Sequence, residues 1–178
     1  EYEVARLHLE QAARLQIGLP AEGQVMAAIG QLGPRKGGDV ILDAFARIAE
    51  RMASVRLIFV GDAHRGQESF AESLKRRAAV PPLAGRVHFF PFTENILPFY
   101  EAANLNLLVS RDEGFGRTII EAGALGVPSV GSNVGGIPEI IVDGVSGRLV
   151  PAEDAKALAA AMFELLRNDR LLNEMADS

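Results

Sequence analysis

The feature that most constrains the fold is an alternation of short apolar runs with helical stretches. Near-continuous apolar runs bounded by Gly or Pro are typical of strands buried on both faces, and intervening helices are typical of a parallel sheet. We therefore predict a single doubly wound α/β domain with an open parallel sheet and right-handed crossovers. The apolar runs lie at residues 25–30, 55–61, 86–90, 105–110, 128–131 and 148–150. The helical stretches lie at residues 39–52, 67–79, 96–103, 118–125, 137–142 and 154–166.

The chain opens with a charged segment that differs from the apolar runs after it. Residues 3–17 indicate a short helix with Val4, Leu7 and Leu15 as its apolar positions, and a Gly-Leu-Pro turn ends it. We therefore divide the chain into residues 1–20, an opening helix and connection, and residues 21–178, the sheet domain.

Composition excludes several classes of protein. The 178 residues have a hydrophobic fraction of 48% and a net charge of −5, which suits a compact domain and argues against a nucleic-acid partner. There is no cysteine, no signal-peptide pattern and no apolar run of membrane-spanning length, so we expect a cytoplasmic chain with no transmembrane segment. His8, His64 and His88 lie far apart without metal-ligand spacing, so we expect no metal.

The loop at residues 30–38 follows the first apolar run and leads into a helix. Ligands of doubly wound sheets bind beyond the carboxyl ends of the strands, where such loops lie. Its glycines allow a close backbone approach, and Arg35 and Lys36 add positive charge, which together suggest a phosphate site. Neither a G-x-G-x-x-G fingerprint nor a Gly-Lys-Ser/Thr motif is present. A solvated turn with two surface cations is the competing explanation, and this segment taken alone favours it.

Two glutamates lie eight residues apart in the segment 110–128. Glu113 opens a Glu-Gly-Phe-Gly run, whose glycines free the amides of residues 114–116 to face an anion. Glu121 lies in an otherwise apolar helical stretch, where an acid requires a polar partner. Carboxylates accept hydrogen bonds from hydroxyls, and eight helical residues span about 12 Å, which would place a diphosphate between a ribose and a sugar.

A purely structural explanation of the two glutamates competes with this one. Glu113 would be favoured by the dipole of a nearby helix N-terminus, and Glu121 would pair with Arg117 four residues earlier. The spacing alone favours the structural explanation. The segment 133–147, with its Gly-Gly and Asp-Gly turns, is also best explained as structure.

These motifs follow one another in a recognisable order. They are Gly30-Gln31-Leu32, Lys36-Gly37, Phe59-Val60-Gly61-Asp62, Val87-His88-Phe89-Phe90-Pro91, Ser110, Glu113-Gly114-Phe115-Gly116, Glu121-Ala122, Gly126-Val127-Pro128, Gly135-Gly136, Glu139, Asp143-Gly144 and Gly147. The ordered set, over residues 18–168, resembles the C-terminal, donor-binding domain of the group-one retaining glycosyltransferases of GT-B fold. The resemblance implies a single Rossmann-like, doubly wound parallel sheet, the C-terminal half of such an enzyme.

The resemblance implies a reaction and a set of roles. A sugar would pass from a nucleotide-diphosphate sugar to an acceptor hydroxyl, with retention at the anomeric carbon, in cell-envelope polysaccharide biosynthesis; the nucleotide is left open among UDP, GDP and ADP. Lys36 and Glu113 would be the catalytic residues, at the diphosphate and the transferred sugar. Glu121 would accept hydrogen bonds from the ribose hydroxyls. The other implied donor-binding residues are Gln31, Arg35, Phe90, Gly114, Phe115, Gly116, Thr118 and Ile119. The loop of residues 90–92 would border the base, and the backbone shape of residues 90–93 would select it.

Two positions depart from the family pattern. Gln31 replaces the usual arginine, so either Arg35 supplies the missing cation or donor affinity is lower. Pro91 replaces the usual glycine, so the loop beside the base would have a different shape. No residue stands in a nucleophile context, which predicts front-face attack by the acceptor. Lys36 would take the role of a metal, so we expect neither a metal nor another cofactor.

The resemblance also implies a missing partner. In this family an acceptor-binding domain precedes the donor-binding one, so we expect this chain to be a fragment. Alone, it would bind a nucleotide sugar but would not catalyse transfer. Any contact with a membrane surface would be made through the missing domain. The alternatives are a non-catalytic nucleotide-sugar-binding module, an interaction-only domain, and a nucleotide-sugar epimerase, which the Glu-Gly-Phe-Gly loop disfavours.

Overall fold

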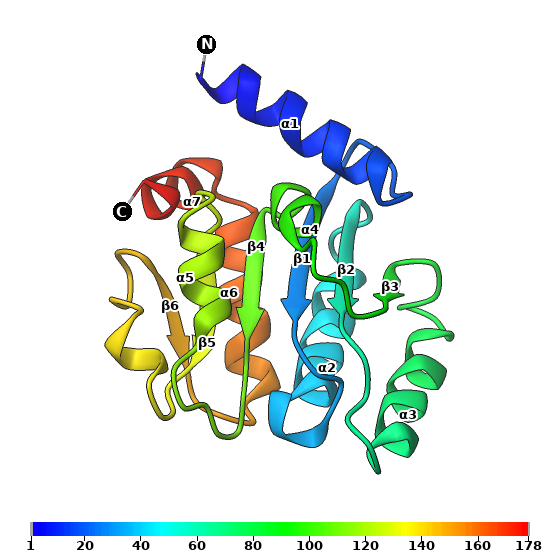
Figure 1. Cartoon of the computed structure of the whole chain (residues 1–178). Helices are drawn as coiled ribbons and strands as arrows, with labels where there is room; N and C mark the ends of the chain where they lie inside the picture. Colours follow the sequence, from blue (N-terminus) through cyan, green and yellow to red (C-terminus); the bar gives the residue numbers. More distant parts are fainter. Residues whose placement is uncertain (1, 178) are drawn as a thin grey trace.

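The computed structural model describes residues 2–177 and confirms the predicted sheet. Six parallel strands within these residues follow the order β3-β2-β1-β4-β5-β6. This is a doubly wound arrangement, in which β2 and β3 are added on one side of β1 and β4 to β6 on the other. Figure 1 shows the strands running in the same direction between two layers of helices. The strands are β1 (Gln24–Ile29), β2 (Val55–Val60), β3 (Val87–Phe90), β4 (Leu105–Leu108), β5 (Ser129–Ser132) and β6 (Gly147–Val150).

The helices agree with the sequence pattern at all but two places. The structure has α1 (Tyr2–Gln16), α2 (Gly38–Ala49), α3 (Glu68–Ala78), α4 (Leu97–Glu101), α5 (Arg117–Gly123), α6 (Ala155–Leu166) and α7 (Asp169–Ala176), with 3₁₀ turns η1 (Pro34–Lys36) and η2 (Ile137–Glu139). The prediction did not include α7, although the Asn168 side chain caps its first turn by accepting from the Leu171 amide at 3.1 Å.

The predicted helix at residues 137–142 is wrong beyond its first turn. The Val142 amide donates to the Ser146 hydroxyl at 3.0 Å, and the Leu149 amide donates to Asp143 at 2.9 Å. These side-chain acceptors fold the segment into a turn that leads to β6, since they offer the backbone an alternative to continued helical bonds.

The two faces of the sheet build separate cores. Along β1, Val25 and Ala27 belong to one cluster and Met26 and Ala28 to the other, as the alternation of a strand requires. The first cluster includes side chains of α4 and α5, and the second includes side chains of α2 and α6. Figure 1 shows these helix pairs on opposite faces of the sheet. No helix within residues 2–177 is long and apolar enough to cross a membrane.

Helix α1 attaches to the domain through a polar face. Arg14 is 2% exposed, whereas Val4, Leu7 and Leu15, the predicted apolar positions, are exposed at 57%, 48% and 63%. The Arg14 guanidinium donates to five acceptors, which are the carbonyls of Ala102, Ala21 and Gly23, the Glu10 carboxylate and the Asn104 side-chain oxygen. The pattern identified the helix but not its inward face, because a fully bonded arginine can be buried as an apolar side chain would be.

Replacement of Arg14 tests this attachment. We expect Arg14→Ala to lower the free energy of unfolding by about 3 kcal/mol or more, because it leaves the Glu10 carboxylate and several carbonyls without their donor. Denaturant unfolding followed by circular dichroism measures the change. Arg170→Ala, which removes an exposed guanidinium on α7, is the control and should leave stability nearly unchanged. Equal effects of the two variants would contradict the assigned role of Arg14.

Candidate functional site

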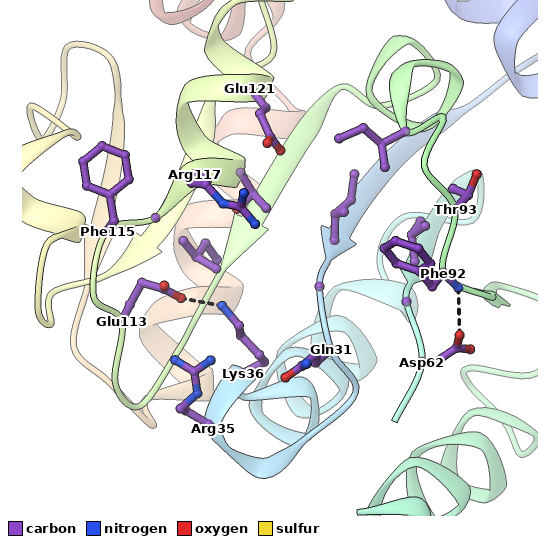
Figure 2. Close-up of a pocket in the computed structure, with 18 of the residues that line it drawn as sticks. Gln31, Arg35, Lys36, Asp62, Phe92, Thr93, Glu113, Phe115, Arg117 and Glu121 are labelled. Carbon is purple, nitrogen blue, oxygen red and sulfur yellow. Dashed lines mark hydrogen bonds and ion pairs between the residues drawn. The ribbon is translucent and has the colours of Figure 1, made fainter. Parts of the chain in front are cut away.

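A cavity of about 800 Å³ opens at the carboxyl ends of β1, β2 and β4. It lies at the point where the loops after β1 and β4 lead to helices on opposite faces of the sheet, the usual ligand position in this architecture. Its volume is within the range of small-molecule sites, about 300–1,000 Å³. Figure 2 shows charged side chains from several loops converging on it. The described residues that line it include Gly30, Gln31, Arg35, Lys36, Asp62, Phe92, Thr93, Glu113, Phe115, Gly116, Arg117, Thr118 and Glu121.

Lys36 and Glu113 form an ion pair across the cavity. Lys36 Nζ donates to Glu113 Oε2 at 2.5 Å, and the Ser110 hydroxyl donates to the same oxygen at 3.0 Å. The Glu113 side chain is 11% exposed, so solvent screens this pair only in part. Figure 2 shows the two side chains reaching toward each other from the loops after β1 and β4. Two residues predicted from separate motifs therefore act as one unit.

The pKa of the Glu113 carboxyl reflects this pairing. Burial alone would raise that pKa, but the hydrogen bond and charge of Lys36, with contributions from Ser110 and Arg35, hold it below its ordinary value. The Glu113 carboxylate is therefore ionised at neutral pH and accepts hydrogen bonds.

Arg111 joins the two loops behind the ion pair. Its guanidinium donates to both carboxylate oxygens of Asp39 at 3.0 and 2.8 Å, to Glu153 at 2.8 Å and to the Pro34 carbonyl. Its amide donates to the Arg35 carbonyl at 2.8 Å. Burial would raise the pKa of the Asp39 carboxyl, but the bonds and charge of Arg111 hold it below its ordinary value. These contacts fix η1, and therefore Lys36, against the segment that contains Glu113.

The loop after β5 supports the Glu113 loop through close backbone contact. Gly135 has φ +52°, and a Cβ atom at this position would lie 1.9 Å from the Glu113 carbonyl oxygen. The Gly136 amide donates to the same oxygen at 3.0 Å. The structural explanation of segment 133–147 therefore describes what this loop does, because it positions Glu113 without lining the cavity.

Glu121 has a partner that the sequence did not indicate. The Tyr100 hydroxyl, from α4, donates to Glu121 Oε2 at 2.8 Å, and Tyr100 is 1% exposed. Burial and the Glu121 hydrogen bond raise the pKa of the Tyr100 phenol, so it stays a donor at neutral pH. Within residues 2–177 no ion pair joins Glu121 to Arg117, the partner that the structural explanation named. One glutamate oxygen is therefore fixed while the group remains at the cavity wall.

The other predicted positions divide into two groups. Gln31, Arg35, Phe115, Gly116 and Thr118 line the cavity together with Lys36, Glu113 and Glu121. Of the remaining three, Gly114 does not line it, Ile119 packs in a small core cluster with Leu108 and Ile137, and Phe90 packs edge-to-face on Phe99. The helix α5 begins at Arg117, so the interval between the two glutamates is not wholly helical and the condition for a 12 Å separation is not met.

Comparison with known proteins identifies the family of the chain. The family model of the group 1 glycosyl transferases matches residues 23–168. This chain belongs to the group 1 glycosyltransferases. The C-terminal domain of a group 1 protein, LpcC from Francisella tularensis, superposes with a TM-score of 0.86 at 23% identity, covering 94% of this chain and 87% of that domain. The fold is accordingly that of the C-terminal domain of the two-domain GT-B architecture.

Curated relatives and other solved structures extend the comparison. D-inositol 3-phosphate glycosyltransferase of Mycobacterium leprae is 35% identical over 158 residues, which cover 88% of this chain and 36% of the relative. Anabaena Alr3699/HepE, solved with UDP and glucose, superposes with a TM-score of 0.87 at 29% identity over 95% of this chain and 45% of that one. Sucrose-phosphate synthase of Thermosynechococcus elongatus gives a TM-score of 0.83 at 29% identity over 96% and 43%. The chain spans about a third of the length of the curated relatives that it matches.

For the loop beside the base, the sequence indicated residues 90–93 without singling out Phe92 or Thr93, and it did not assign Asp62 or Arg117 to this cavity. Asp62 and Thr93 line it from the loops after β2 and β3, and Arg117 lines it from the start of α5. Phe92 is 69% exposed at its wall, two residues beyond the predicted Phe90. The Asp62 carboxylate accepts from the Phe92 amide at 3.2 Å, a bond drawn in Figure 2. The positions of Asp62, Phe92 and Thr93 soon after a strand were the available signal, which Arg117, at the start of α5, does not share.

The low pKa of Glu113 predicts a pH-dependent contribution to stability. Because the folded pKa lies below the unfolded value of about 4.3, the ionised carboxylate stabilises the fold above about pH 4.3 and loses this effect as pH falls through the folded pKa. The difference in unfolding free energy between the native chain and Glu113→Gln should therefore be constant from pH 5.5 to 7 and shrink below about pH 4. Denaturant unfolding at each pH measures it. The same comparison in a Lys36→Met background should lose most of this shrinkage, and a pH-independent difference in the native background would contradict the pairing.

Proposed function

We propose that this chain binds a nucleotide-diphosphate sugar and supplies the donor half of a retaining glycosyltransferase. The observation that carries the proposal is the convergence of the Lys36–Glu113 pair and Glu121 on one cavity at the switch point of the sheet. A cation and two hydroxyl-accepting carboxylates are the groups that a sugar nucleotide requires. The presence of UDP and glucose in the similar Anabaena structure supports a UDP-sugar as the first donor to test.

The lining residues suggest how the donor lies. Glu121, held by Tyr100, accepts from the ribose hydroxyls, and Glu113 accepts from hydroxyls of the transferred sugar. Lys36 lies beside Glu113, so the diphosphate passes near it on the way between the two carboxylates. The base lies toward Phe92 and Thr93, where the Asp62 bond fixes the backbone of the loop. This assignment leaves the base wall to Phe92 in place of Phe90.

The proposed chemistry breaks the bond between the anomeric carbon and the diphosphate oxygen and forms one to the acceptor oxygen. The acceptor attacks on the face that the diphosphate leaves, which retains the configuration, and its proton passes to the departing phosphate oxygen. Lys36 offsets the charge that develops on the diphosphate, and Glu113 orients the sugar and faces its developing positive charge. Among residues 2–177 no group of three or more His, Asp or Glu is arranged for a metal, and the proposed mechanism requires none.

The acceptor belongs to the larger protein in this proposal. An additional domain, present in the greater length of the relatives, would bind the acceptor hydroxyl opposite Glu113 and make any membrane contact. We propose that the acceptor belongs to cell-envelope polysaccharide biosynthesis and that the protein acts in the cytoplasm.

A non-catalytic nucleotide-sugar-binding module is the alternative, and Gln31 is the observation that favours it. Glutamine at this position of the cavity wall offers no charge to a diphosphate. Sugar transfer by the parent protein separates the two, since a binding module would retain donor affinity without transfer.

The ribose role of Glu121 predicts a loss of nucleotide affinity in Glu121→Gln. A charge-assisted hydrogen bond contributes about 1.5–3 kcal/mol, so UDP affinity should fall about tenfold to a hundredfold. Titration calorimetry of the chain with UDP measures it, and GDP and ADP in the same assay rank the bases. Glu164→Gln, on the surface of α6, is the control and should bind as the native chain does. Equal affinity of Glu121→Gln and the native chain would exclude the ribose role.

The Tyr100 contact predicts a second effect. Tyr100→Phe removes the hydroxyl that fixes Glu121, so the carboxylate is less well oriented for the ribose. UDP affinity should fall about threefold to tenfold. The preference for UDP over its 2′-deoxy and 3′-deoxy analogues should fall as well, which a general loss of stability would not produce. An unchanged preference would show that Tyr100 serves only the core.

A further inference from the structure

Two of the cations that line the cavity are not matched by an acid within residues 2–177. Three basic side chains line it among the described residues, which are Arg35, Lys36 and Arg117. The charge of Lys36 is already matched by Glu113 at 2.5 Å, and Gln31 contributes none. A nucleotide diphosphate carries at least two negative charges, so its binding favours a cation that is not already paired.

Arg35 and Arg117 differ in where they offer charge. Arg35 Nη1 donates to the Asp112 carbonyl at 3.2 Å, and its charge acts on Glu113, so it lies on the sugar side of the site. Arg117 lies at the first position of α5, four residues before Glu121 on the same helix. Residues four apart on a helix are neighbours on the same face, so Arg117 lies beside Glu121, the proposed ribose acceptor. The two arginines therefore flank different parts of a bound donor.

The Arg117 guanidinium is also the less restrained of the two. Within residues 2–177 no ion pair or side-chain hydrogen bond holds it, whereas Arg35 donates to the Asp112 carbonyl. Figure 2 shows its side chain directed into the cavity, between Glu121 and the Lys36–Glu113 pair in that view. Exposure alone does not distinguish Arg117 from a solvated surface arginine, but Arg117 lines the cavity together with Lys36 and Glu121.

We propose that Arg117 binds the phosphate next to the ribose and supplies the cation that Gln31 lacks. This inference rests on the proposed function, since it assumes a nucleotide with its ribose at Glu121. A guanidinium presents a planar pair of donors to phosphate oxygens, so Arg117 can bind two of them at once. Arg35 and the Lys36–Glu113 pair then remain for the distal phosphate and the sugar.

The test compares Arg117→Gln with the native chain for UDP and UMP by titration calorimetry, and for uridine by ligand-observed NMR. We expect about a tenfold to hundredfold loss of affinity for UDP and UMP alike, with uridine binding unchanged. Arg117→Lys, which keeps the charge without the planar fork, should retain part of the affinity. Arg76→Gln, an exposed arginine on α3, is the control and should change nothing.

Each other outcome overturns the inference in a distinct way. A loss for UDP alone would move Arg117 to the distal phosphate, and an equal loss for uridine would make its role structural. Unchanged affinity would remove Arg117 from the site. Failure of the native chain to bind UDP, GDP and ADP would instead overturn the proposed function, so the two failures can be told apart.

Discussion

The geometry of the site depends on loops that meet backbone to backbone at the end of the sheet. Gly37 has φ +66°, and a Cβ atom there would lie 2.1 Å from the Val109 carbonyl oxygen, so the loop after β1 lies directly against the end of β4. Gly135 approaches the Glu113 carbonyl in the same way from the loop after β5. Such contacts leave no room for side chains between the loops. Lys36 and Glu113 meet because the loops that hold them are in direct backbone contact with the end of β4 and with the loop after β5.

The acidic groups of the site are positioned before any ligand arrives. Glu113 is held by Lys36 and Ser110, and Glu121 is held by Tyr100 from α4. Partners that fix a carboxylate reduce the reorganisation needed when a substrate binds, which is the general basis of electrostatic preorganisation. The same partners make the two acids tolerable near the protein interior, so their structural contacts are compatible with the proposed roles in donor binding.

The sequence predicted the sheet and the edge at which the site lies, because buried parallel strands are nearly continuous apolar runs and their loops carry the ligand groups. It did not predict contacts between distant residues. The sequence gives no sign that Tyr100 is more than a core aromatic residue, and its contact with Glu121 depends on the fold. The sequence did not separate Phe90 from Phe92, because both are aromatic and close to the end of a strand. In the structure Phe90 packs on Phe99, and Phe92 is exposed at the cavity wall. The apolar periodicity of α1 also failed to predict its buried face, because the buried residue there is Arg14, whose partners are distant in the sequence.

The buried Arg14 has a mechanical consequence. Its bonds to Ala21 and Gly23 hold α1 to the segment that starts β1, and the Asn104 side chain bonds both Arg14 and the Val25 amide. In Figure 1 the strands point away from α1, so β1 runs from this anchor to Gly30 at the cavity. A force on α1 would therefore act directly on the strand whose carboxyl end borders the cavity.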